Sequence, residues 1–141
     1  MAHAGAYLDF ASNLFTTAGF MPHGECYLWQ PGPLWLNAVS DSLIAMSYYS
    51  IPLALVYFVY IRRDLSFRWM FVMFGIFILA CGTTHIMNVW TIWRPLYWLD
   101  GYIKAVTAAS SVVTAALLWP LIPKAMELQS PEQLRRINSQ L

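Results

Sequence analysis

The sequence predicts an all-α membrane protein with three transmembrane helices. Of its 141 residues, 59% are hydrophobic and only 11% are charged, whereas about 25% of the residues in a typical soluble domain are charged. Three apolar stretches each reach the roughly 20 residues that a helix needs to cross a bilayer. Seven Trp, eight Tyr and eight Phe supply the amphipathic rings that gather where lipid meets water. No basic patch with interleaved aromatic residues indicates a nucleic-acid partner, so we expect membrane lipid around the chain instead.

The N-terminal segment, residues 1–38, is expected to be extracytoplasmic or interfacial. It contains no Lys or Arg, so it lacks the basic region of a secretory signal and is expected to be retained. Residues 7–15 predict a short helix lying in the membrane interface. Glycines and prolines then predict a break in regular structure: Gly19, Pro22, Gly24, Pro31, Gly32 and Pro33.

The three membrane helices are predicted at about 37–61, 69–93 and 97–122, within a transmembrane domain at 39–125. A short basic loop at 62–68 separates the first two, and an aromatic turn at 94–101 separates the last two. Basic residues gather in the first loop and after the third helix, while Arg94 is alone in the second turn. The positive-inside rule therefore predicts an N-terminus outside the membrane and a cytoplasmic C-terminus.

Residues 126–141 predict the start of a cytoplasmic signalling helix. Ser130 is a candidate N-cap, Pro131 suits the first helical position and Gln133 completes a capping box. The apolar residues Leu134 and Leu141 belong to a heptad-like series with Ile137 between them, which is typical of a coiled coil. A simple amphipathic end is the alternative.

Cys81 and His85 are the candidate metal ligands. They lie four residues apart in the second apolar stretch, so both project from one face of a helix. One thiolate and one imidazole in apolar surroundings favour Cu(I) over the oxygen-seeking Mg²⁺, Ca²⁺ and Mn²⁺. Zinc normally takes four ligands, more than this stretch offers. Asn88, one turn beyond His85, is a candidate to orient the His85 ring. The alternative is a buried small thiol and a histidine that hydrogen-bonds a neighbouring helix.

Asp41 and Lys104 are charged residues within apolar stretches, where charge is costly and indicates a partner, a cavity or a function. At 1.5 Å per residue, Asp41 lies roughly 6 Å from the start of the first helix and Lys104 roughly 10 Å from that of the third. His85 lies roughly 12 Å from the end of the second. We therefore expect that Asp41 and Lys104 can form an ion pair in a layer next to the metal ligands. A headgroup-level carboxylate and a snorkelling lysine are the alternatives.

The face of the first helix below Asp41 carries Tyr48, Ile51 and Pro52. Pro52 has no backbone donor, so we expect it to bend this helix and free a carbonyl inside the membrane. Bent helices open cavities.

Cys26 follows His23-Gly24-Glu25 in the N-terminal segment. An oxidising compartment would allow it an intersubunit disulfide, and it could hold metal loosely with His23. A free thiol is the third interpretation.

Several motifs in order resemble the ethylene-binding domain of the ethylene receptor family. They cover about residues 40–125: Ser40-Asp41 with Tyr48, Ser50-Ile51-Pro52-Leu53, Val56-Tyr57-Phe58-Val59, Arg68-Trp69, Phe74-Gly75-Ile76-Phe77-Ile78, Cys81-Gly82-Thr83-Thr84-His85 and Trp90-Thr91. The likeness is to bacterial members that head sensor histidine kinases more than to the plant receptors. The plant receptors carry an N-terminal cysteine pair, whereas Cys26 is single here.

This resemblance implies a three-helix, non-catalytic sensor domain that assembles as a homodimer in a bacterial inner membrane. It implies that Cys81 and His85 hold Cu(I), that ethylene binds the copper, and that a downstream kinase or other output domain receives the signal. The resemblance also assigns to the binding region six residues, namely Asp41, Tyr48, Ile51, Pro52, Ile78 and Lys104.

Three other functions remain open on the sequence. The Cys81/His85 pair, with His23 and Cys26, also fits a copper or redox sensor. Small residues along the third helix fit a structural anchor and dimerisation module. Ion passage along Asp41 and Lys104 is the least favoured, since only two charges are available and both lie near one surface.

Overall fold

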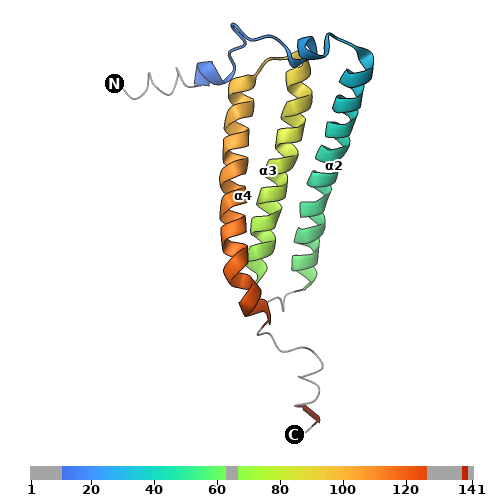
Figure 1. Ribbon diagram of the computed structural model, residues 1–141. Coiled ribbons are helices and arrows are strands. Elements are labelled where there is room, and N and C mark those ends of the chain that lie inside the picture. The colour runs from blue at the N-terminus through green and yellow to red at the C-terminus, as the bar shows by residue number, and fades with distance from the viewer. Residues whose placement is uncertain (1–10, 63–66, 127–137, 140–141) are drawn as a thin grey trace, which may run out of the picture.

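The computed structural model describes residues 11–62, 67–126 and 138–139. Three long helices lie side by side: α2 (Pro31–Ile61), α3 (Arg68–Trp93) and α4 (Tyr97–Met126) (Figure 1). A short 3₁₀-helix, η1 (His23–Tyr27), lies against one end of α3. We call this end of the bundle the η1 end. Helix α3 packs against both α2 and α4, whereas no Cα atom of α2 lies within 8 Å of one of α4. The middle helix therefore has a face that α2 and α4 flank without covering.

Each of the three helices is long and apolar enough to cross a membrane. The predicted all-α class with three transmembrane helices is thereby confirmed. The buried core is small, with Leu34, Ala38 and Ile92 forming its cluster, and most large apolar side chains face outward. In a bilayer this exposure carries no penalty, because lipid tails are as apolar as the side chains they touch.

Helix α2 begins at Pro31, six residues before the predicted start. The predicted break at residues 31–33 is wrong. Pro31 and Pro33 lie in the first turn, where the backbone N–H groups have no intrahelical acceptor and a missing donor costs nothing. The helix then continues through Pro52 to Ile61.

The other boundaries lie close to the predicted ones. Helix α3 ends at Trp93 as predicted, and α4 starts at Tyr97 and passes through Pro120 and Pro123 to Met126. Of the interfacial helix predicted at 7–15, residues 11–14 are helical and 7–10 lie outside the described residues. The helix predicted from Ser130 also lies outside them, except that residues 138–139 are helical.

The N-terminal segment is fastened across the η1 end. The Tyr97 hydroxyl donates a hydrogen bond to the Met21 carbonyl at 2.9 Å, and the Phe20 and Tyr97 rings meet edge to face. A Cβ on Gly24 would lie 2.7 Å from the Trp29 ring and 3.0 Å from the Ile92 carbonyl oxygen. Only glycine therefore lets η1 approach the end of α3 this closely. In this position η1 covers the polar groups described below.

Candidate functional site

Asp41 and His85 meet between α2 and α3. The Nδ1 atom of His85 lies 2.7 Å from Oδ1 of Asp41, and the two side chains are 26% and 20% exposed. A carboxylate can only accept a hydrogen bond, so Nδ1 carries the hydrogen and donates it. In the neutral form of the imidazole, this tautomer leaves a lone pair on Nε2. The carboxylate thus fixes both the orientation and the tautomer of the imidazole, as outer partners of metal-bound histidines do.

Tyr48 closes one side of the His85 ring. The two rings meet edge to face, with centroids 5.7 Å apart and planes at 89°. The helices come close here because Gly82 has no side chain: a Cβ at this position would lie 3.0 Å from the Tyr49 ring and 3.1 Å from Cβ of Tyr48. The His85 ring is therefore held by α2 through both Asp41 and Tyr48.

Cys81 and His85 share one face of α3, one turn apart, as the spacing predicted. Cys81 is a free thiol and is partly exposed, while its carbonyl accepts a hydrogen bond from the Thr84 hydroxyl at 2.7 Å. In the described part of the chain, no group of three or more His, Cys, Asp or Glu side chains is arranged to hold a metal ion. A thiol and a free imidazole nitrogen fit a soft, low-coordinate ion such as Cu(I), and fit a four-ligand zinc site poorly.

The apolar residues expected near the site lie farther from the η1 end, on α2 and α3. Pro52 is buried. A Cβ built on Gly75 of α3 would lie 3.9 Å from Cβ of Pro52, so Pro52 packs on α3. Ile51 is 41% exposed, and Ile78, three residues before Cys81, is half-buried.

Lys104 does not pair with Asp41. Its Nζ atom lies 2.7 Å from Oδ2 of Asp100, one turn earlier on α4, and Asp41 is paired with His85 instead. The physical reason is that an i,i+4 pair on one helix needs no contact between helices, whereas no Cα atom of α2 lies within 8 Å of one of α4. The two charges nevertheless border one polar cavity of about 210 Å³ beneath η1. Residues of all the elements line it, among them His23, Asn37, Asp41, Asn88, Asp100 and Lys104.

Asp41 lies deeper than counting residues along α2 had indicated. The count from residue 37 gave roughly 6 Å, whereas the contact with His85 puts the carboxylate at the depth of a residue roughly 12 Å from the end of α3. The charged group and the candidate ligands therefore form one layer, where the sequence had predicted two adjacent ones.

Two contacts at the site are not among those that the sequence predicts. The i,i+4 spacing of Asp100 and Lys104 was a readable signal for their pair. No pattern in the sequence predicts the Asp41–His85 hydrogen bond, because it depends on how α2 and α3 are oriented relative to each other. Asn88, predicted to orient the His85 ring, lines the polar cavity. The ring nitrogen Nδ1 donates its hydrogen bond to Asp41.

Comparison with known families adds an independent finding. A family model described as "Ethylene receptor 1-like, N-terminal domain" matches residues 33–128, a range that contains all three transmembrane helices apart from the first two residues of α2. No solved structure matches the chain. The matched range exceeds half of the sequence and includes every residue of the site above, from Asp41 to Lys104. The chain is an integral membrane protein that belongs to the ethylene receptor 1-like N-terminal domain family.

Proposed function

We propose that this chain is an ethylene sensor domain in which Cys81 and His85 hold Cu(I). The observation that carries the proposal is the 2.7 Å contact between Asp41 and Nδ1 of His85. A carboxylate buried this far in a membrane helix is costly, and orienting a metal-binding imidazole gives it a function.

The chain's own residues fit this ion through their donor atoms. Cys81 supplies a thiolate sulfur and His85 supplies Nε2, since Asp41 occupies Nδ1. Tyr48 keeps the ring from swinging away from Cys81. When bound, Cu(I) supplies a soft Lewis acid that shares electron density with the π system of an alkene.

Selection for a small apolar ligand comes from the surroundings of the pair. Pro52 is buried and packs on α3 at Gly75. Ile51 precedes Pro52 on α2, and Ile78 lies three residues before Cys81 on α3. We assign these three residues to the wall of the ethylene site. A wall without polar atoms cannot compensate the desolvation of a polar competitor, so it favours an alkene over water.

Signalling requires parts beyond the binding site. We propose that the N-terminus lies outside a bacterial inner membrane, that two chains form a homodimer, and that the helix expected from Ser130 leads to a cytoplasmic kinase or other output domain. Ethylene acts by binding one packing arrangement of the helices better than another, because a ligand shifts an equilibrium only through differential affinity. In this proposal the domain itself catalyses no reaction.

The test is saturable binding of radiolabelled ethylene to membranes that contain the chain and are loaded with Cu(I). Cys81→Ser is expected to abolish saturable binding because the soft sulfur ligand is lost. Cys26→Ser is the matched control, since Cys26 is exposed and outside the site, and it should bind as the unchanged chain does. Full ethylene binding by Cys81→Ser would refute the proposed ligand.

A copper sensor is the second candidate, and one observation favours it. His23 lines the cavity that Asp41 also borders, so a possible metal ligand of the N-terminal segment lies in the same cavity as the residue that bonds His85. This function predicts that His23→Ala weakens copper binding while ethylene has no effect on the loaded protein. Equilibrium dialysis against a Cu(I) chelator, with and without ethylene, separates the two candidates.

A further inference from the structure

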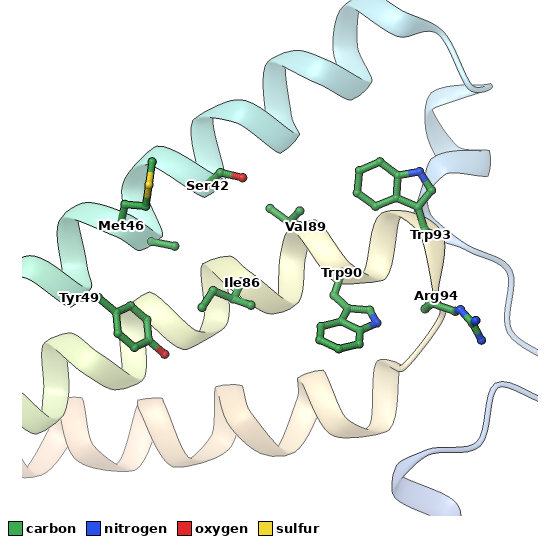
Figure 2. Close-up of a pocket in the computed structure, with 9 residues that line it drawn as sticks. Ser42, Met46, Tyr49, Ile86, Val89, Trp90, Trp93 and Arg94 are labelled. Atoms are coloured by element: carbon green, nitrogen blue, oxygen red, sulfur yellow. The ribbon is translucent and has the colours of Figure 1, made fainter.

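A second cavity lies between α2 and α3, on the side away from the candidate metal ligands. It is a groove of about 700 Å³. Figure 2 shows residues that line it, with Met46 and Tyr49 from α2, Ile86, Trp90 and Trp93 from α3, and Arg94 just after α3. Tyr48 contacts His85, and Tyr49 projects about 100° further round α2. The groove and the metal ligands are thus on opposite sides of the α2/α3 contact.

Arg94 is the one charged residue of the groove lining. It is exposed, and it follows directly on the last residue of α3 at the η1 end. All three carboxylates in the described part of the chain are engaged elsewhere: Glu25 with Trp29, Asp41 with His85 and Asp100 with Lys104. Among the described residues, each carboxylate group thus already has a hydrogen-bond or ion-pair partner other than Arg94.

The groove has the length of one membrane leaflet. At its inner end the Tyr49 hydroxyl and Thr83 Oγ1 form a hydrogen bond of 2.8 Å across the two helices. Thr83 is ten residues from Trp93, which is about 15 Å along a helix. The hydrocarbon core of a bilayer is about 30 Å thick, so the bond closes the groove near the middle of the membrane.

We propose that this groove binds an anionic phospholipid of the leaflet at the η1 end. One acyl chain lies along Met46, Ile86 and Trp90, and the phosphate pairs with the Arg94 guanidinium. Arginine binds phosphate oxygens through two parallel N–H donors, and a tryptophan beside it suits the headgroup level. A transmembrane helix of a second copy fits less well, because it would run the full thickness of the membrane, whereas the Tyr49–Thr83 bond closes the groove near its middle.

The test counts lipids retained by the full chain in native mass spectrometry after titration with palmitoyl-oleoyl phosphatidylglycerol or phosphatidylcholine. We expect one phosphatidylglycerol to be retained at lower lipid concentration than any phosphatidylcholine. Arg94→Gln should weaken that binding about fivefold, the effect of removing one cationic side chain at a membrane surface. Lys124→Gln is the matched control, because Lys124 is an exposed cation outside the groove, and it should leave this lipid in place.

A second pair of variants tests the groove without changing charge. Met46 is 62% exposed and lines the groove, whereas Leu43 is 55% exposed on α2 and does not line it. Met46→Trp should fill the groove and displace the lipid, and Leu43→Trp should not. Equal retention of the two lipids, or full retention by both Arg94→Gln and Met46→Trp, would overturn the proposal. So would a disulfide between two Met46→Cys chains in the membrane, because it would make the groove a contact between copies.

Discussion

The hydrogen bond between Asp41 and His85 gives each of two polar groups within membrane helices the partner that it needs. A carboxylate in a membrane helix needs a donor, and an imidazole ligand needs a partner that fixes its tautomer. The contact at 2.7 Å satisfies both needs. It also links α2 to α3, so a change in the position of the ring is transmitted to the packing of α2.

Replacing Asp41 by Asn tests this orienting role. The amide keeps the shape but removes the negative charge, and it can present its own N–H₂ to the ring, which then keeps its hydrogen on Nε2. We expect the affinity for Cu(I) to fall about 10- to 100-fold, as when an outer partner of a ligand is lost. Competition with a Cu(I) chelator measures the change. Glu25→Gln, which neutralises a carboxylate outside the site, should have no effect, and an unchanged affinity in Asp41→Asn would exclude the role.

The Lys104–Asp100 pair makes a separate prediction about stability. Asp100 is 8% exposed, and its Oδ1 atom has no hydrogen-bond partner among the described residues. Lys104→Met would leave this carboxylate without its cation, so we expect the free energy of unfolding to fall by about 1–3 kcal/mol. Adding Asp100→Asn should recover most of the loss, because the uncompensated charge disappears. Unfolding in mixed micelles measures both, and a double variant as unstable as Lys104→Met would contradict this account.

The closest approach of α2 to α3 depends on Gly82. A Cβ there would meet the Tyr49 ring at 3.0 Å and Cβ of Tyr48 at 3.1 Å, and the second of these atoms cannot move without the helix backbone. Small residues let membrane helices approach in this way. The contact that holds Tyr48 against His85 therefore depends on the absence of one methyl group.

Gly82→Ala should accordingly destabilise the bundle by about 1–3 kcal/mol, the usual cost of overpacking, and should weaken ethylene binding by shifting Tyr48. Gly101→Ala is the matched control. Gly101 also lies in a helix, but a Cβ there meets nothing within 4 Å, so the change should be neutral or stabilise α4 by up to about 1 kcal/mol. Thermal unfolding in detergent compares the two. Similar losses of stability in both variants would show that the contact at Gly82 does not set the distance between α2 and α3.

The helices themselves could be predicted because their determinants are local. Length, apolar character and charged boundaries gave the end of α3 at Trp93 and the start of α4 at Tyr97. The start of α2 was misjudged because Pro31 was interpreted only as a helix breaker, although proline is well suited to a first turn. The error therefore concerned the position of a proline within a helix, and the type of structure was predicted correctly.

The pairing within the site could be predicted only in part. The i,i+4 rule places Cys81 with His85 on one face, and applied to α4 it also gives Asp100 with Lys104. The contact of Asp41 with His85 depends on the relative rotation and vertical shift of α2 and α3, which no local pattern contains. Counting residues from an assumed boundary put Asp41 too near the surface, since the boundary itself was six residues off.

Helix α3 lies in the middle of the bundle, between α2 and α4 (Figure 1). The two sides of the bundle differ in chemistry. One side carries Asp41, His85 and the polar cavity, and the other carries the apolar groove that ends at Arg94. Both sides are open in a single chain. In our proposals the first side serves metal and ethylene, while the second serves lipid, so the lipid around the chain acts on the same α2/α3 contact as the ligand does.

The orientation of the whole bundle gives the last prediction. By the positive-inside rule, Lys124 and the arginines between the first two membrane helices predict that the end opposite η1 is cytoplasmic. Cys26 is an exposed free thiol at the η1 end. A membrane-impermeant maleimide should therefore label Cys26 in intact spheroplasts, and Cys26→Ser should abolish this labelling because Cys81 lies within a membrane helix. A Cys26→Ser chain that carries Lys124→Cys should react only in inverted vesicles. Labelling of Lys124→Cys from the outside would show the opposite orientation, with the polar cavity that Asp41 borders on the cytoplasmic side.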